Sequence, residues 1–253
     1  MSEKDGLKKG SLVTAYGYGG ASCLVALLGS MLLACLPVSR PRRERWTRFL
    51  IHRLCRGFVA YMRFFGLLEA DFDGLSRLAE RRGIIIAVNH PTYLDALLIM
   101  SQMPDVFCLM KASIQNNPLI GPTARNAGYE SNANAAVLMQ NCRTRLNRGE
   151  KLLIFPEGTR TVIEPVGQFK KGFALFATAA PAPVVTVLAM SPNGTFLGKN
   201  RSFFRLPESL PLRYRFTVSK EFTVDPGEGL QEFTQRVETH FRETLANSHS
   251  IHA

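Results

Sequence analysis

The sequence has few cysteines and lacks several common catalytic motifs. Its five cysteines are odd in number and far apart, and no CxxC pair occurs among them. A disulfide framework or a zinc site is therefore not expected, and a reducing compartment suits the main domain. There is also no GxSxG turn, no Walker-type phosphate loop and no HExxH pair. These absences argue against an acyl-enzyme hydrolase, a P-loop enzyme and a zinc protease.

Acidic residues are scarce relative to basic ones. The chain has 31 Lys and Arg against 20 Asp and Glu, a formal net charge of +11. Such an excess indicates an anionic partner, either nucleic acid, a phospholipid surface or phosphorylated substrates. With 253 residues, 46% of them hydrophobic, the chain can build one sizeable core, or one domain with a small appendage.

Charge is missing altogether from the 30 residues between Lys9 and Arg40, and residues 12–36 are mostly apolar. This run exceeds the ~20 residues that cross a bilayer core. A secretory signal peptide is the competing interpretation, but its apolar region would be shorter, and LACLPVSRPRR is a poor cleavage site. The Gly-rich first half leaves open a helix that enters one leaflet and returns. We expect a retained N-terminal anchor.

A strongly basic segment follows the anchor, with eight arginines and one glutamate from Arg40 to Arg63. On a helix, basic side chains share one face and apolar ones the opposite face. The basic set is Arg45, Arg48, His52, Arg56 and Arg63; the apolar set is Leu50, Leu54, Phe58, Tyr61, Phe65 and Leu68. The pattern predicts a helix lying on an anionic membrane. A helix packed on the core with a solvated basic face is the alternative.

The position of the arginines also predicts an orientation. Their excess after the anchor places the following domain on the cytoplasmic side of the inner membrane. We find no nucleic-acid-binding motif, so a phospholipid surface is the expected partner and nucleic acid is not.

The remainder of the chain alternates between strand-like and helix-like segments after a short acidic connector, EADFDG. Strands are expected at residues 83–90, 105–111, 151–158 and 182–190, with a strand pair or one long strand at 212–224. Helices are expected at residues 91–102, 133–147, 170–180 and 228–246. The alternation predicts an α/β fold with a mainly parallel or mixed sheet flanked by helices. We therefore divide the chain into an N-terminal membrane-associated helical pair, residues 1–69, and a catalytic domain, residues 70–253.

The stretch NHPTYLD, residues 89–95, ends the first of these strands. Functional groups of such folds gather at the carboxyl ends of strands. His90 is expected in a turn, before a helix that begins at Pro91, so it can fold back to where Asp95 reaches its ring. Asp95 would then fix the tautomer of His90 and stabilise the imidazolium. This geometry suits a general base that acts on a hydroxyl.

The stretch FPEGTR, residues 155–160, ends another strand. Gly158 allows the backbone to turn closely around a ligand, and Arg160 offers a planar fork suited to phosphate. Glu157 could orient Arg160 or contact an acceptor. A tight turn with a surface ion pair is the alternative.

Together, NHPTYLD and FPEGTRT resemble the signature of the glycerolipid acyltransferase family, that of the 1-acylglycerol-3-phosphate acyltransferases. Lys111, the loop at residues 118–121 and FKKG at residues 169–172 are also similar. The resemblance implies transfer of a fatty acyl group from acyl-CoA or acyl carrier protein to a lysophospholipid-type hydroxyl. It also implies an N-terminal helical pair on the membrane.

The resemblance assigns roles to particular residues. His90 would deprotonate the acceptor hydroxyl, supported by Asp95, and the hydroxyl would attack the thioester directly. Glu157, Gly158, Thr159 and Arg160 would hold the acceptor head group, with Lys111 nearby as a further cation. No metal or organic cofactor is expected beyond the thioester co-substrate.

The sequence departs from the family pattern between the two motifs. Family members carry there an arginine that binds the acceptor phosphate, whereas AGYESNANAA has Asn134 at that position, with Arg125 as a nearby substitute. Thr186 stands where proline is common. An acceptor without phosphate, such as a lyso-ornithine lipid or a polyketide-type ester, is therefore an alternative. A non-catalytic lipid-binding protein is the rival from another class, but it leaves the paired motifs unexplained.

Overall fold

Helices and strands alternate along the chain, and the strands form a mixed sheet. The computed structural model describes residues 3–132, 134–162, 165–192, 198, 207 and 209–250. The helices are α1 (Glu3–Ala34), α2 (Arg40–Phe64), α3 (Leu75–Glu80), α4 (Leu94–Met100), α5 (Ala112–Gln115), α6 (Gly121–Asn126), α7 (Ala135–Asn147), α8 (Gly172–Ala179) and α9 (Leu230–Ser250). The strands are β1 (Leu68–Asp71), β2 (Ile85–Val88), β3 (Val106–Met110), β4 (Glu130–Ser131), β5 (Lys151–Ile154), β6 (Val184–Met190) and β7 (Leu212–Phe222).

The order of strands across the sheet is β1-β7-β6-β2-β5-β3-β4. Among the strand pairs of the described residues, β6–β7 alone is antiparallel. The central strands are continuous buried runs, such as IIAV in β2, as expected where helices cover both faces of a parallel sheet. Residues 212–222 form one long strand whose first half alternates between buried and exposed side chains. The predicted α/β fold with a mixed sheet is confirmed.

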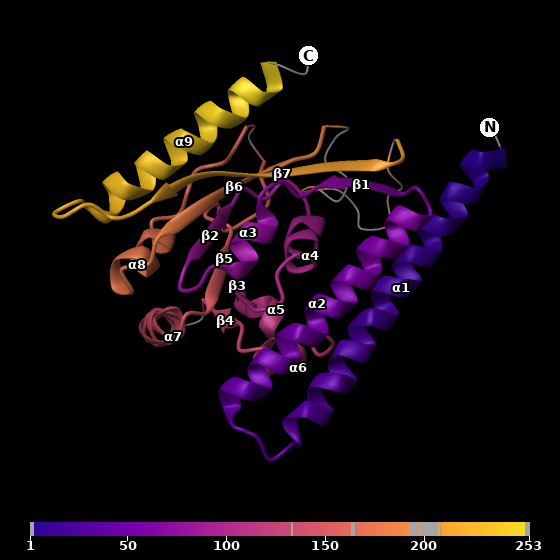
Figure 1. Cartoon of the computed structure of the whole chain (residues 1–253), viewed down its shortest axis with the longest axis horizontal. Coiled ribbons are helices and arrows are strands. Elements are labelled where there is room, and N and C mark those ends of the chain that lie inside the picture. The colour runs from indigo at the N-terminus through magenta and orange to yellow at the C-terminus, as the bar shows by residue number, and fades with distance from the viewer. Residues whose placement is uncertain are drawn as a thin grey trace.

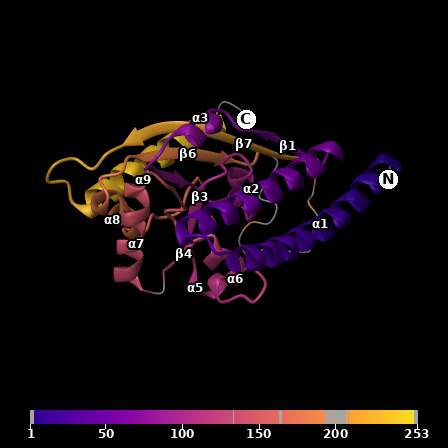
Figure 2. The same ribbon diagram turned by 60° about the horizontal axis from the view of Figure 1, so that its bottom comes forward.

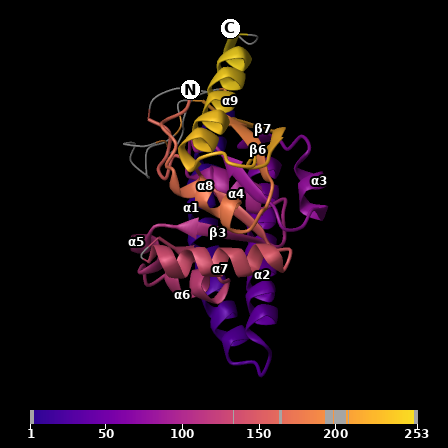
Figure 3. The same cartoon turned by 90° about the vertical axis from the view of Figure 1, so that its left-hand side faces the viewer.

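Helices enclose the sheet and extend beyond it at one end. Helix α9 lies along β6 and packs on α8, whereas α7 lies at the β4 end (Figure 3). Helices α1 and α2 form a long antiparallel pair along another side of the molecule, and their connecting turn projects away from the sheet (Figures 1 and 2). The largest fully buried side chains include five phenylalanines, Phe107, Phe173, Phe216, Phe233 and Phe241.

Two local predictions differ from the structure. Helix α4 begins at Leu94 rather than at Pro91, so residues 91–93 form a turn and lengthen the loop after β2. The acidic connector, residues 69–74, contains most of β1, because Leu68–Asp71 pair with Leu212–Arg215 of β7. The expected boundary between residues 69 and 70 therefore lies inside a strand of the main sheet.

Helix α1 contains a stretch, Gly10–Ala34, that is long and apolar enough to cross a membrane. A signal sequence near an N-terminus can pass the same test of length and composition. One face of α1 packs on α2 and α6, and Leu12, Ala15 and Ser30 are buried there. Elsewhere on α1, large apolar side chains are exposed, among them Leu24, Leu28 and Leu32.

The basic face predicted for α2 is divided between protein and solvent. Arg45 and Arg56 are exposed, but Arg48 and His52 are buried. The His52 Nδ1–H donates to the carbonyl of Met100 at the end of α4 (2.8 Å). The prediction that this whole face meets a membrane was therefore wrong for Arg48 and His52, because part of it packs on the α/β domain.

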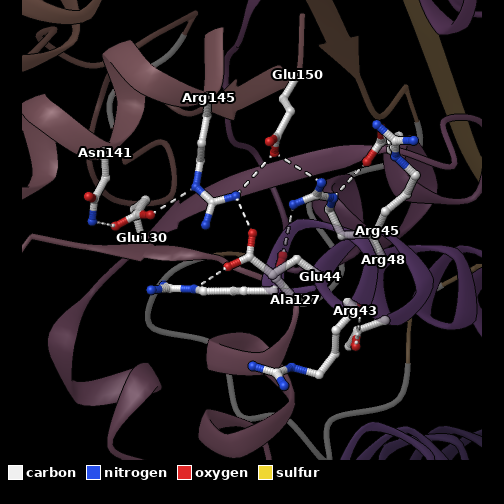
Figure 4. A network of polar contacts seen from close by, with 12 residues as sticks. Arg43, Glu44, Arg45, Arg48, Ala127, Glu130, Asn141, Arg145 and Glu150 are labelled. Carbon is white, nitrogen blue, oxygen red and sulfur yellow. Dashed lines mark hydrogen bonds and ion pairs between the residues drawn. The ribbon is translucent and has the colours of Figure 1, made fainter. Parts of the chain in front are cut away.

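Buried and half-buried charged side chains connect α2 to that domain, and Figure 4 shows how Glu44, Arg48 and Arg145 lie among them. We call them the docking network: Glu44, Arg48, Asp105, Glu130, Arg145 and Glu150. Arg48 contacts Asp105 at 2.7 Å and Glu150 at 2.9 Å. Arg145 contacts Glu44 at 2.7 Å, Glu130 at 3.0 Å and Glu150 at 3.1 Å. Since buried charges are tolerated only when paired, these contacts fix the position of α2.

Candidate active site

Three neighbouring parallel strands end at the same edge of the sheet and carry the predicted site residues there. Ala87 of β2 lies beside Ile154 of β5, and Leu153 of β5 lies beside Cys108 of β3. His90 follows β2, residues 157–160 follow β5, and Lys111 follows β3. The topology therefore brings together the ends of segments that are up to 70 residues apart in the chain.

The two predicted catalytic side chains are in contact. His90 Nδ1 lies 2.9 Å from Asp95 Oδ2, where Asp95 is fully buried and the His90 side chain is 16% exposed. Since an ionised carboxylate only accepts, Nδ1 carries the hydrogen and Nε2 is left with its lone pair. Asp95 reaches the ring from the first turn of α4, across the loop that the late start of this helix creates.

Every oxygen of the Asp95 carboxylate has a partner. Oδ2 also accepts from the backbone N–H of Thr92 (2.8 Å), and Oδ1 accepts from the Thr92 hydroxyl (2.8 Å). The Tyr214 hydroxyl in turn lies 3.1 Å from the Thr92 hydroxyl. Burial, with a smaller contribution from the negative charge of Asp95, raises the pKa of Tyr214.

The backbone of His90 is fixed on both sides by the second motif. Its N–H donates to Glu157 Oε1 (3.0 Å), and its carbonyl accepts from the Thr161 N–H (2.7 Å). The imidazole stacks on the ring of Phe155, with centroids 3.9 Å apart and planes at 21°. The ring therefore has an apolar wall on one face and Asp95 at one edge.

In this structure three hydrogen bonds of Glu157 connect two loops, and none of the three involves Arg160. Its carboxylate is buried and accepts from His90 N–H, the Thr161 hydroxyl (2.8 Å) and Gly167 N–H (2.9 Å). These three bonds tie the loop after β2 to the loop after β5. The expected contact between Glu157 and an acceptor would have to compete with them.

The guanidinium of Arg160 lies over the ring of Tyr93, 3.6 Å from its centroid. It also donates to the Tyr93 hydroxyl (3.1 Å) and to the carbonyl of Gly198 (2.6 Å). Gly158 has φ +64°, a conformation that favours glycine, and Thr159 beside it is half-buried. The motif thus forms a tight turn whose arginine is held near the NHPTYLD loop.

Two further cations, Lys111 and Arg125, lie outside the two motifs. Lys111 is exposed and immediately precedes α5. Arg125 donates to the carbonyl of Gln115 (2.7 Å). Asn134, at the position of the family arginine, is the N-cap of α7, where its side chain accepts from the Val137 N–H (3.2 Å). A capping role accounts for asparagine at this position.

Four site residues were not predicted: Thr92, Tyr93, Phe155 and Tyr214. The first three lie inside the two motifs, so their proximity to His90 could have been inferred from the motifs themselves. Tyr214 lies on β7, 122 residues from Thr92, and only its place among alternating buried positions marked it as facing inward. In the described part of the chain, no group of three or more His, Cys, Asp and Glu side chains could hold a metal ion.

Comparison with known proteins shows what the part of the chain that carries both motifs is similar to. The family model described as Acyltransferase matches residues 69–190, which include both motifs. A lyso-ornithine lipid O-acyltransferase of Pseudomonas aeruginosa is 32% identical over 151 residues, covering 57% of this chain and 54% of the relative. A 1-acyl-sn-glycerol-3-phosphate acyltransferase of Cocos nucifera is 30% identical over 147 residues, covering 55% of this chain and 46% of the relative. These matches support the glycerolipid acyltransferase family for the part of the chain that they cover.

The fold is similar to that of a solved structure over nearly the whole chain. The crystal structure of the 1-acyl-sn-glycerophosphate acyltransferase PlsC from Thermotoga maritima superposes with a TM-score of 0.70 at 17% identity, covering 95% of this chain and 97% of that one. The sequence alignments, by contrast, span about half the length of the curated relatives.

Proposed function

We propose that this protein is an O-acyltransferase that moves a fatty acyl group from a thioester to the hydroxyl of a lyso-lipid. The observation that carries the proposal is the contact of 2.9 Å between His90 Nδ1 and Asp95 Oδ2, which leaves Nε2 as a base. Arg160, stacked on Tyr93 of the loop that carries His90, supplies a cation beside this base. A family relationship to acyltransferases supports the same chemistry.

The reaction needs one proton to move twice. Nε2 of His90 takes the proton of the acceptor hydroxyl while its oxygen attacks the thioester carbonyl carbon, forming a tetrahedral oxyanion. Collapse of that intermediate breaks the C–S bond, and the departing thiolate takes the proton back from His90. Asp95 stabilises the transient imidazolium, and the Phe155 ring limits its rotation. The products are an ester and a free thiol.

The donor is acyl-CoA or acyl carrier protein, which is a co-substrate rather than a bound cofactor. For the acceptor, a 1-acylglycerol-3-phosphate-like lipid suits the guanidinium of Arg160 together with Gly158, Thr159 and Lys111. An acceptor without phosphate, such as a lyso-ornithine lipid, is the second candidate. It is favoured by Asn134, whose side chain caps α7 where the family pattern has a phosphate-binding arginine.

The membrane is the proposed site of action, with the α/β domain on its cytoplasmic side. The exposed apolar side chains of α1 and the exposed arginines of α2 would bring the site to the surface where acyl chains reside.

The test is an assay of the purified full chain with a radiolabelled acyl thioester and a panel of lyso-lipids with and without phosphate. We expect acceptor-dependent release of thiol and formation of an acylated lipid. His90→Ala should reduce turnover at least ~10²-fold, the lower range for loss of a general base, while lipid binding persists. Free fatty acid formed without an acceptor would indicate a hydrolase, and full turnover by His90→Ala would refute the assignment of the base.

A further inference from the structure

A chain of buried hydroxyl groups reaches the proposed catalytic pair from the far side of Asp95. The Tyr214 hydroxyl on β7 lies 3.1 Å from Thr92 Oγ1, which lies 2.8 Å from Asp95 Oδ1. Thr92 and Asp95 are 0% exposed and Tyr214 is 3% exposed. The chain therefore joins a strand near the end of the sheet to the loop that carries His90.

The hydrogen bonds that connect Tyr214, Thr92 and Asp95 can have only one donor-to-acceptor direction. An ionised Asp95 accepts but does not donate, so the single proton of the Thr92 hydroxyl is directed to Oδ1. The oxygen of Thr92 then accepts, both from the Leu94 N–H (3.2 Å) and from Tyr214. Tyr214 must consequently be the donor and keep its proton, in keeping with the effect of burial, which raises its pKa.

This arrangement leaves the carboxylate little freedom. Oδ1 is occupied by the Thr92 hydroxyl, while Oδ2 is shared by the Thr92 N–H and His90 Nδ1. Rotation of the carboxylate would break all three bonds of a side chain that is 0% exposed, and unmade hydrogen bonds of a buried group are costly. The orientation of Asp95 decides in turn which nitrogen of His90 carries the hydrogen.

We propose that Thr92 and Tyr214 are positioning residues of the acyl transfer: their hydroxyl chain holds Asp95 so that His90 presents Nε2 to the acceptor. The inference rests on the proposed function, because it concerns the same histidine. Neither residue touches the reacting atoms, so their loss should lower kcat and leave substrate binding intact.

A direct role in substrate binding is the main alternative for Tyr214. Tyr214 is also among the residues that line an open pocket of about 460 Å³, together with Arg63, Arg213 and Arg215. A residue that binds substrate there would change KM when its hydroxyl is removed. A residue that acts through Asp95 would change kcat.

The experiment compares Tyr214→Phe, Thr92→Val and Thr92→Ser in the full chain, with acyl thioester and lyso-lipid both varied. Tyr129→Phe is the matched control, since it removes another buried tyrosine hydroxyl. That hydroxyl contacts Met100 Sδ and does not belong to the row of hydroxyl groups that ends at Asp95. We expect kcat to fall about tenfold in Tyr214→Phe and about a hundredfold in Thr92→Val with KM nearly unchanged, as for removal of one buried hydrogen bond and of several. Thr92→Ser should recover most of the kcat that Thr92→Val loses.

The possible results separate this inference from the function on which it rests. If the wild-type protein turns over, His90→Ala does not, and Tyr214→Phe matches Tyr129→Phe, the positioning role is refuted and the function stands. A rise in KM without loss of kcat in Tyr214→Phe also refutes it. If the wild-type protein transfers no acyl group to any acceptor tested, the proposed function fails. Thermal melting of each variant shows whether a loss of kcat reflects a loss of folded protein, in which case Tyr214→Phe, the smallest change, decides.

Discussion

The carboxylates of Asp95 and Glu157 have different roles, although both contact His90. Asp95, in the first turn of α4, and Glu157, just after β5, are both buried. Each accepts three hydrogen bonds. Asp95 accepts one of its bonds from an imidazole, which suits the proposed proton transfer. Glu157 accepts its bonds from two backbone N–H groups and one hydroxyl, and so joins two loops. The partners, rather than the residue type, decide which carboxylate supports chemistry.

Asp95→Asn should separate geometry from charge at this pair. The amide retains the size of the side chain, but it cannot stabilise an imidazolium and it favours the wrong tautomer of His90. We expect kcat to fall roughly 10³- to 10⁴-fold, as for the equivalent change in a serine protease triad, with KM little changed. Asp73→Asn, an exposed change, is the control in steady-state assays. A decrease of less than tenfold in Asp95→Asn would show that Asp95 does not support the base.

At the scale of elements, α2 is attached to the α/β domain by charge as well as by apolar packing. Although burial raises the pKa of Glu44, hydrogen bonds and charge from Arg145 and Arg40 outweigh it, so the pKa of Glu44 lies below its ordinary value. Gly128, which precedes β4, has φ +70°, and a Cβ there would lie 2.4 Å from Arg145 Nη2. The docking network thus depends on contributions from several segments, and each acidic member depends on a nearby guanidinium.

Removing one member of the docking network should therefore lower the free energy of unfolding more than removing an exposed charged side chain does. Arg145→Met leaves Glu44, Glu130 and Glu150 buried without their shared partner. The expected loss is about 3–5 kcal/mol in the free energy of unfolding, the usual cost of breaking a buried ion pair from one side. Arg143→Met, an exposed change on the same helix, should stay within about 0.5 kcal/mol. Equal unfolding midpoints in urea for both variants would contradict a stabilising role for the network.

The contact between α2 and α4 should make stability depend on pH. Burial lowers the pKa of His52 below its ordinary value of 6.5, and the charges of Arg56 and Arg53 lower it further, against the hydrogen bond to Met100. The unfolded chain then binds a proton more readily than the folded one. The contribution of neutral His52 is therefore complete above pH 6.5 and is lost as the pH falls below that value.

His52→Gln should make the free energy of unfolding depend less on pH in the range below pH 6.5. Urea unfolding of wild type and variant between about pH 5 and pH 8 measures the difference, which should narrow toward low pH. Since the pKa of His240 is also lowered, chiefly by burial, some pH dependence should persist in the variant. Parallel profiles for the two proteins would show that His52 does not titrate differently on folding.

At the scale of the whole molecule, the α1–α2 pair gives the protein one side that carries a row of exposed apolar side chains. The exposed apolar residues of α1 recur at steps of four, as Leu24, Leu28 and Leu32, so they share one face of the helix. The side of the molecule that carries α1 and α2 lies away from α8 (Figure 1). Such a one-sided distribution suits a protein that meets a membrane in one orientation.

Leu28→Glu combined with Leu32→Glu should weaken membrane association without loss of the fold. Two apolar side chains of this kind contribute about 3–6 kcal/mol when fully buried, so most of the protein should move from the membrane to the soluble fraction. Leu175→Glu on α8, also an exposed leucine, is the control. Vesicle co-sedimentation measures the partition, and equal binding of the double variant and the control would contradict the proposed membrane face.

The sequence by itself determined the α/β alternation, the two motifs that resemble the acyltransferase signature and the pairing of His90 with Asp95. These features are local: buried apolar runs specify strands, and five residues across one turn bring a carboxylate to an imidazole. Only the tertiary structure decided that Tyr214 supports Thr92, that Glu157 joins two loops, and that Arg48 and His52 of α2 face protein. Helical periodicity shows which side chains share a face, but it does not show what that face meets. The partners that make a buried arginine or tyrosine tolerable come from segments a hundred residues away, and only folding brings them together.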